Sequence, residues 1–419
     1  MAATQAGKGL APGRGAGGAR RGSPLRLRPR LPAQMGAGRQ AGVLGGGPMA
    51  ILSAMLPASL TAILGLAAAL SAPAALAAHR AAAGPAVEYV FSADQAGHDL
   101  SAFQVTPDGG LRPLAGTPRP VGAYPVGVAL APDGRTVYVA NQGSGSVSAL
   151  QVREGRLVEL PGSPYPVGGH PDGVAVAPDG RALLVTFEDA DRLRLYRLDP
   201  RGRLEGPVAA AATGRHPISV TLSPDGRLAA VTDFYGRAVE LFRVAPARGA
   251  EGLTRLARAA TGDRPIASAF SPDGRYLYVA DYGDITVHAF RVEEGGGALR
   301  PVPGSPFVAG AQPYAVALDP RGRFLFAANW GSHDLSAFAV NPASGRLRPL
   351  PGSPYRTDWF PYAVVVDPED RYVYVANNGA GNISAFRLDP ATGALAPLGR
   401  FRTGAGPYGM VVGEARPAR

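Results

Sequence analysis

The chain has 419 residues, no cysteine, and a formal net charge of +10. Nine of its 42 lysines and arginines lie in residues 1–80, which contain no acidic residue, so residues 81–419 hold 33 basic against 32 acidic side chains. This balance argues against a nucleic-acid partner, and the missing cysteine excludes disulfides, thiolate metal ligands and a cysteine nucleophile.

The first segments along the chain have the order of an export signal. Residues 1–48 are a basic leader rich in glycine and proline, which we expect to be disordered. Residues 49–78 contain an apolar run followed by small residues, as a signal peptide does. We interpret residues 79–86 as a linker and residues 87–415 as the folded domain.

Ala75-Leu76-Ala77 has the small-x-small form that a signal peptidase requires, which predicts cleavage after Ala77. The mature protein would then be periplasmic or extracellular. Two alternatives stay open. Translation could start at Met35 or Met49, and an uncleaved segment 49–70 could serve as a membrane anchor, which would be the protein's only contact with a membrane.

A repeat of 46 or 48 residues follows, and a period of this size indicates a repeat architecture. Each repeat starts with a proline before a short apolar strand, continues through an Asp-Gly-type turn, and enters a second strand that is often rich in tyrosine. The seven prolines are Pro125, Pro171, Pro217, Pro265, Pro313, Pro361 and Pro407.

One repeat is enough to predict the unit of structure. Residues 314–318 alternate large and small side chains, residues 319–323 form a tight turn, and residues 324–328 are a second strand rich in aromatic residues. A third strand and a short outer strand follow at 335–340 and 347–350. Four antiparallel strands in about 48 residues are typical of one blade of a β-propeller.

We predict an all-β fold, a seven-bladed β-propeller with four antiparallel strands per blade. The second strand at 89–93 comes before any first strand, and the last first strand, 407–412, has no second strand after it. The C-terminal strand is therefore expected to join three N-terminal strands in one blade, which closes the ring and removes free sheet edges. We expect one domain and a monomer.

Residues 272–281 (PDGRYLYVAD) and 371–379 (RYVYVANNG) carry a family resemblance. They resemble the YVTN-type repeats of the seven-bladed propeller lactonase family, and the resemblance covers roughly residues 87–415. The Gly-Ser-Pro segments that start at Gly162, Gly304 and Gly352 resemble those of exported members. The resemblance implies a 6-phosphogluconolactonase-like activity, the hydrolysis of a sugar-acid lactone.

Members of this family commonly carry His-Pro-His or Pro-Arg-His where a first strand starts, as acid/base and anion-binding groups. His170-Pro171 and His216-Pro217 keep the first histidine, but Asp172 and Ile218 replace the second one. Arg264 stands before its proline instead of after it. The resemblance implies His170, His216 and Arg264 as catalytic residues, with these departures from the family pattern.

In a propeller, the starts of the first strands and the loops between second and third strands lie on one face, around the central channel. A concave mouth with convergent polar groups is the usual place for a ligand. We expect an ionisable sector of this mouth near His170 and an aromatic sector on the opposite side. The residues predicted to bind substrate are Asp172, Glu188, Arg237, Tyr314, Trp330, Trp359, Tyr362 and Tyr408.

Lactone hydrolysis requires a base that titrates near neutral pH, for which histidine is the natural residue. It also requires a donor to the developing oxyanion, and Arg264 or Arg237 could supply it or bind an acidic sugar. The plainer interpretation is that both histidines are only polar turn residues, and that Trp330 and Trp359 only pack at blade junctions.

Two functions stay open on the sequence. The first is an exported lactonase that acts on a small-molecule lactone. The second is a non-catalytic binding propeller that presents Trp330 and Trp359 to a carbohydrate, a peptide or a cell-envelope partner. We expect no cofactor and no metal, because the sequence contains no phosphate-binding glycine loop, nucleophile elbow or zinc-ligand spacing.

Overall fold

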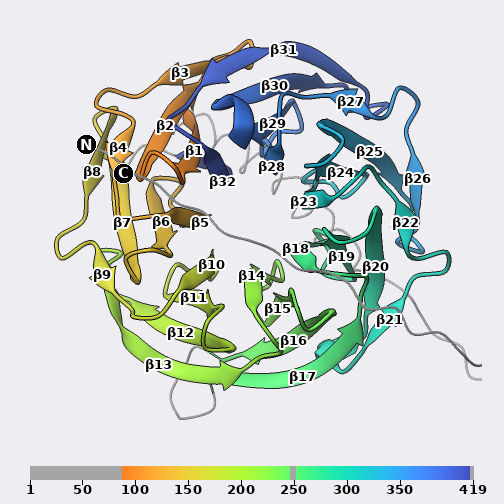
Figure 1. Cartoon of the computed structure of the whole chain (residues 1–419), viewed down its shortest axis with the longest axis horizontal. Coiled ribbons are helices and arrows are strands. Elements are labelled where there is room, and N and C mark those ends of the chain that lie inside the picture. The colour runs from red at the N-terminus through yellow and green to blue at the C-terminus, as the bar shows by residue number, and fades with distance from the viewer. Residues whose placement is uncertain (1–86, 246–251, 416–419) are drawn as a thin grey trace, which may run out of the picture. The chain divides into compact units, whose positions relative to one another are not determined.

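The structure is a computed structural model, and it describes residues 87–245 and 252–415. These residues form seven sheets of four principal antiparallel strands, arranged as a ring around a central channel (Figure 1). The prediction of an all-β, seven-bladed propeller is confirmed. The predicted leader, signal and linker lie outside the described residues. Within the described part, no helix has the length and apolar character needed to cross a membrane.

Each blade has two inner strands, a first strand next to the channel and a second strand paired with it. The first strands, which surround the channel, are β5 (Pro125–Leu130), β10 (Pro171–Val176), β14 (Pro217–Leu222), β18 (Pro265–Phe270), β23 (Pro313–Leu318), β28 (Pro361–Val366) and β32 (Pro407–Ala415). The second strands are β6 (Thr136–Asn141), β11 (Ala182–Phe187), β15 (Leu228–Asp233), β19 (Tyr276–Asp281), β24 (Phe324–Asn329), β29 (Tyr372–Asn377) and β1 (Val87–Asp94).

The two outer strands complete each blade. The third strands are β7 (Ser146–Arg153), β12 (Arg192–Leu198), β16 (Ala238–Val244), β20 (Thr286–Val292), β25 (Asp334–Val340), β30 (Asn382–Leu388) and β2 (Asp99–Val105). The fourth strands are β8 (Arg156–Glu159), β13 (Leu204–Ala212), β17 (Leu253–Ala260), β21 (Leu299–Pro301), β26 (Leu347–Pro349), β31 (Leu395–Arg402) and β3 (Leu111–Pro113). Short additional elements are β4 (Arg119–Pro120), β9 (Tyr165–Pro166), β22 (Phe307–Val308), β27 (Tyr355–Arg356), η1 (Glu294–Gly296) and η2 (Asn378–Ala380).

One blade combines strands from both ends of the folded domain. The C-terminal strand β32 pairs antiparallel with β1, with Val87 opposite Ala415 and Val90 opposite Val412. Strands β2 and β3 then follow β1 outward in the same sheet. Figure 1 shows β32 next to β1, on the channel side of the blade. This is the one-plus-three arrangement that the order of strands in the sequence predicts.

The second strands form the core of the propeller. All six residues of β6 are buried, and so are all six of β29. Tyrosines of the second strands pack at blade junctions, and their hydroxyls also reach the next blade. Tyr138 donates to the carbonyl of Gly202 at 2.7 Å, and Tyr278 donates to that of Gly345 at 3.0 Å. Burial of each aromatic ring therefore comes with a hydrogen-bond partner for its polar end.

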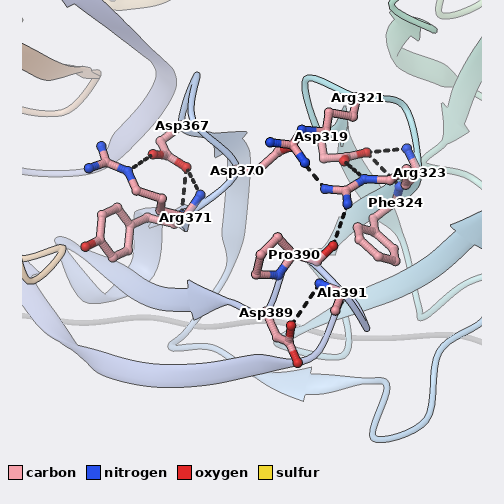
Figure 2. A network of polar contacts seen from close by, with 11 residues as sticks. Asp319, Arg321, Arg323, Phe324, Asp367, Asp370, Arg371, Asp389, Pro390 and Ala391 are labelled. Atoms are coloured by element: carbon pink, nitrogen blue, oxygen red, sulfur yellow. Dashed lines mark hydrogen bonds and ion pairs between the residues drawn. The ribbon is translucent and has the colours of Figure 1, made fainter.

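The turns between first and second strands lie on the face that we call the base. In the turn after β23, Asp319 accepts hydrogen bonds from the amides of Arg323 and Phe324 at 2.5 and 2.7 Å and from the Arg323 side chain at 3.1 Å. The next blade repeats this arrangement with Asp367 and Arg371 (Figure 2). A buried carboxylate thus holds each of these turns.

The same arginines connect neighbouring blades across the base. Arg323 extends to the carboxylate of Asp370 at 3.0 Å and to the carbonyl of Pro390 at 2.5 Å (Figure 2). Arg371 binds Glu88 on β1 at 2.6 Å. The pKa of Glu88 is raised to about 7, mainly by burial and to a smaller extent by the charge of Asp367. The ring is closed here by side-chain pairs as well as by strand pairing.

Candidate active site at the channel mouth

The backbone of the channel mouth repeats from blade to blade. The proline that starts each first strand lies opposite the last residue of the second strand, as Pro217 does with Asp233. The carbonyl before the proline then accepts a hydrogen bond from the amide that follows the second strand. Phe234 donates to His216 in this way at 3.0 Å, and the equivalent bond is present in all seven blades.

Each blade therefore presents three side chains at fixed positions, and we define the channel mouth by these residues. Those before the prolines are Tyr124, His170, His216, Arg264, Gln312, Phe360 and Gly406. Those after the prolines are Val126, Asp172, Ile218, Ile266, Tyr314, Tyr362 and Tyr408. Those after the second strands are Gln142, Glu188, Phe234, Tyr282, Trp330, Asn378 and Gln95.

Several of the residues before the prolines have a strained backbone. Non-glycine residues at five of these seven positions have φ between 50° and 58°: Tyr124, His216, Arg264, Gln312 and Phe360. A proline disfavours helical conformations in the residue before it, and left-handed backbone without glycine costs on the order of 1 kcal/mol. The repeated carbonyl hydrogen bond maintains this conformation, so the scaffold fixes the position of whichever side chain stands there.

The ionisable sector of the mouth is centred on Glu188. Its carboxylate lies 3.5 Å from Nδ1 of His170 and 3.2 Å from Nε2 of His216. The loop that carries Glu188 also holds both histidines by their backbones, because Asp189 accepts from the amide of His170 at 3.0 Å and Asp191 accepts from that of His216 at 2.8 Å. One four-residue loop thus brings together two histidines that lie 46 positions apart in the sequence.

Asp172 lies beneath this cluster and is buried. Its only polar side-chain contact among those of the described residues is with the amide of Gln142, at 3.2 Å. Burial, reinforced by the nearby charge of Glu188, raises the pKa of Asp172 well above its usual range. A carboxyl group in this environment favours its protonated form, which can donate a hydrogen bond.

Three tyrosines line the channel next to Asp172. Tyr314 and Tyr408 share a hydrogen bond between their hydroxyls, and the rings of Tyr314 and Tyr362 have centroids 4.2 Å apart. Burial raises the pKa of Tyr314 and that of Tyr408, so both hydroxyls stay protonated at neutral pH. Together with first-strand residues they line a channel cavity of about 260 Å³, of which Asp172 is also a lining residue.

The predicted arginines do not join the histidine cluster. The guanidinium of Arg264 lies 3.7 Å from one carboxylate oxygen of Asp263, and that of Arg237 lies 3.5 Å from the other. Asp263 therefore offsets at most one of their two positive charges. Among residues 87–245 and 252–415, no group of three or more histidine, aspartate or glutamate side chains is arranged to hold a metal ion.

Aromatic rings continue the mouth from His216. The centroid of the His216 ring lies 5.9 Å from that of Phe234, which lies 6.3 Å from Tyr282, which in turn lies 6.0 Å from Trp330. Trp330 stacks on Phe360 at 4.6 Å with an interplanar angle of 21°. We call these five residues, His216, Phe234, Tyr282, Trp330 and Phe360, the aromatic row. The two sectors are therefore continuous, whereas the sequence led us to expect them on opposite sides of the mouth.

Next to Phe360, the last residue of the aromatic row, lies the most exposed large apolar side chain of the described residues. Trp359 is 64% exposed, and its ring lies 6.4 Å from Phe360 and stacks on His333 at 6.0 Å. Phe234 and Tyr282 were missed by the sequence reasoning. The signal for them was their position directly after the last residue of a second strand, which is also the position of Glu188 and Trp330.

The comparisons with known proteins agree with this fold. The family model described as "Lactonase, 7-bladed beta-propeller" matches residues 58–350 and 201–412. A putative 6-phosphogluconolactonase from Bacteroides fragilis is 20% identical, with a TM-score of 0.66 over 78% of this chain and 98% of that one. The periplasmic gluconolactonase of Pseudomonas aeruginosa is 24% identical, with the same TM-score over 78% and 99%. No curated protein matches the chain.

Proposed function

Because the chain belongs to the seven-bladed β-propeller lactonase family, we propose that it hydrolyses a sugar-acid lactone at the channel mouth. The observation that carries the proposal is the carboxylate of Glu188 between two imidazoles, at 3.5 Å from His170 and 3.2 Å from His216. A carboxylate that accepts a hydrogen bond from the N–H of an imidazole orients the ring and leaves the other nitrogen as a base. This arrangement suits the activation of water.

The reaction needs three movements of protons and electrons. An imidazole takes a proton from water, and the water oxygen forms a bond to the lactone carbonyl carbon. The tetrahedral intermediate then collapses, the bond from carbon to the ring oxygen breaks, and the protonated imidazole returns a proton to that oxygen. The products are a free hydroxyl and a carboxylic acid. His170 and His216 lie on either side of Glu188, so either imidazole is placed to take this proton and return it.

Other predicted residues enter the proposal in supporting roles. Asp172, favoured in its neutral form, would donate a hydrogen bond at the floor of the site. Tyr314, Tyr362 and Tyr408 would shape that floor. Arg264 and Arg237 would act from the rim, with their charge reduced by Asp263. A substrate bound by strong phosphate contacts fits this arrangement less well than a neutral sugar lactone.

Export is a part of the proposal that rests on the leader sequence. The apolar run and the small residues around Ala77 support it. Fractionation of the native host, followed by N-terminal sequencing, tests it. A mature chain that begins near residue 78 outside the cytoplasm is the expected result, and an intact leader on a cytoplasmic protein would contradict it.

The function itself is tested with purified protein and a panel that includes glucono-δ-lactone and 6-phosphogluconolactone. We expect hydrolysis of at least one lactone above the spontaneous rate, and we expect Glu188→Gln to reduce kcat/KM by about 100-fold or more. Glu205→Gln is the matched control, because it removes the same charge from an exposed position on β13 of the same blade. The absence of turnover with every lactone, or full activity of Glu188→Gln, would overturn the proposal.

A further inference from the structure

We propose that the aromatic row, together with Trp359, is a second binding subsite that receives an uncharged sugar unit attached to the lactone. This inference deepens the proposed function, on which it rests, because it names the substrate class as an aldonolactone that carries a glycosyl substituent. The row begins at His216, which contacts Glu188, and ends at Phe360, which adjoins the exposed ring of Trp359.

The extent of the row is the first reason for a larger substrate. Its rings come from four consecutive blades, and neighbouring centroids are never more than 6.3 Å apart. A lone aldonolactone has a single ring and could cover only the part of the row next to His216. The remaining rings, Trp330 and Phe360, and the adjoining Trp359 would then contact no substrate. They continue the surface of the proposed catalytic site without a gap.

The chemistry of the row indicates a sugar. A sugar ring has an apolar face of C–H groups and an edge of hydroxyls, which suits flat aromatic side chains flanked by hydrogen-bonding groups. The mouth provides both, because the amide side chains of Gln312 and Asn378 occupy positions on either side of Trp330 and Phe360 in the repeated scaffold. Both amides can donate and accept hydrogen bonds, which matches the hydroxyl groups of a sugar.

Exposure argues against an alkyl chain in this place. An alkyl chain gains its binding energy from removal of its whole surface from water, which requires an enclosed groove. The rings here are only half-buried, and Trp359 is 64% exposed, so one side of any ligand would stay in water. A sugar ring tolerates this environment because its outer edge is polar.

A kinetic comparison tests the inference on the full protein. We expect kcat/KM for cellobiono-δ-lactone to exceed that for glucono-δ-lactone by about tenfold, because a second ring would stack on the row. Trp359→Ala should bring this ratio close to one, mainly through a higher KM for the disaccharide lactone. Tyr124→Ala is the matched control, since it removes another exposed aromatic residue of the same mouth that makes an edge-to-face contact with His98 and lies outside the row. It should keep the ratio.

Intrinsic fluorescence separates this inference from the proposed function. Trp330 and Trp359 are the only tryptophans of the chain, so any change in tryptophan emission reports on the subsite. Cellobionate, the stable open acid, should change the emission of the wild type in a saturable way, and gluconate should have a much weaker effect. Glu188→Gln should keep this response. If no lactone is hydrolysed but cellobionate still binds at the tryptophans, the proposed function fails and the sugar subsite stands.

Two results would overturn the subsite itself. The first is a ratio of kcat/KM for cellobiono-δ-lactone to kcat/KM for glucono-δ-lactone that is the same in Trp359→Ala as in the wild type. The second is the absence of any saturable fluorescence change with cellobionate. A wild type that hydrolyses glucono-δ-lactone but shows both results would leave the proposed function intact and remove the inference.

Discussion

The two faces of the propeller use the same repeat in different ways. On the base, two successive turns carry the same pair of side chains for the same purpose, Asp319 with Arg323 and Asp367 with Arg371. On the mouth, the backbone repeats in all seven blades, but the side chains at equivalent positions differ from blade to blade. A repeated backbone bond thus holds a set of variable side chains, which is how a regular scaffold can carry one asymmetric site.

The largest expected effect concerns the two histidines of the mouth. His216 has the shorter contact with Glu188 and a side chain that is 29% exposed, whereas that of His170 is 59% exposed. We therefore expect His216→Asn to lower kcat/KM by about 100-fold and His170→Asn by about tenfold. Steady-state kinetics with the best lactone of the panel checks this order. A larger loss in His170→Asn would mean that the more exposed imidazole is the principal base.

A base variant should change stability without changing catalysis. Arg323→Ala removes the partner of the buried carboxylate of Asp319 and the link to Asp370, so we expect a loss of about 3 kcal/mol in the free energy of unfolding. Arg321→Ala is the control, because its side chain is 65% exposed and its pair with Asp370 should contribute less than about 1 kcal/mol. Denaturant unfolding measures both. Equal losses would show that burial of Asp319 is not the source of the effect.

The blade formed by β14–β17 should show a dependence of stability on pH. Asp233 is buried beside Glu240, and burial, followed by the charge of Glu240, raises the pKa of Asp233 to about 8. A raised folded-state pKa of a carboxyl group means that, as the pH rises, the unfolded chain releases this proton at a lower pH than the folded protein does. Stability from this group is therefore complete below about pH 4 and falls as the pH rises towards 8.

Asp233→Asn removes this titration. We expect the variant to be more stable than the wild type at pH 8.5, by on the order of 2 kcal/mol, and to differ little at pH 4. Thermal unfolding at both pH values measures the difference. A variant whose stability relative to the wild type does not change between these pH values would contradict the assigned pKa.

Much of the fold could be predicted because the period is visible in single residues. The seven prolines and the second strand at 89–93 were sufficient for the number of blades and for the shared blade, since each proline starts a first strand and each first strand pairs with one second strand. The mouth could be located for the same reason. His170, His216 and Glu188 were named from their positions in the repeat, before any contact between them was known.

The contacts between side chains could not be predicted in the same way. Arg264 pairs with Asp263, its neighbour in the chain, because a local partner is always within reach, whereas the expected role required a distant one. Phe234 and Tyr282 resembled ordinary turn residues, and only the ring geometry shows that they connect His216 to Trp330. Such contacts depend on how the side chains of adjacent blades pack against one another, which the repeat period does not encode.

The most direct test of this division between mouth and base is a paired measurement on Glu188→Gln and Arg323→Ala, with lactone turnover and thermal unfolding recorded on the same preparations. We predict that Glu188→Gln loses about 100-fold in kcat/KM and keeps its melting temperature, while Arg323→Ala melts at a lower temperature and keeps its turnover. A fully active Glu188→Gln, or a loss of turnover in folded Arg323→Ala equal to that of Glu188→Gln, would contradict it.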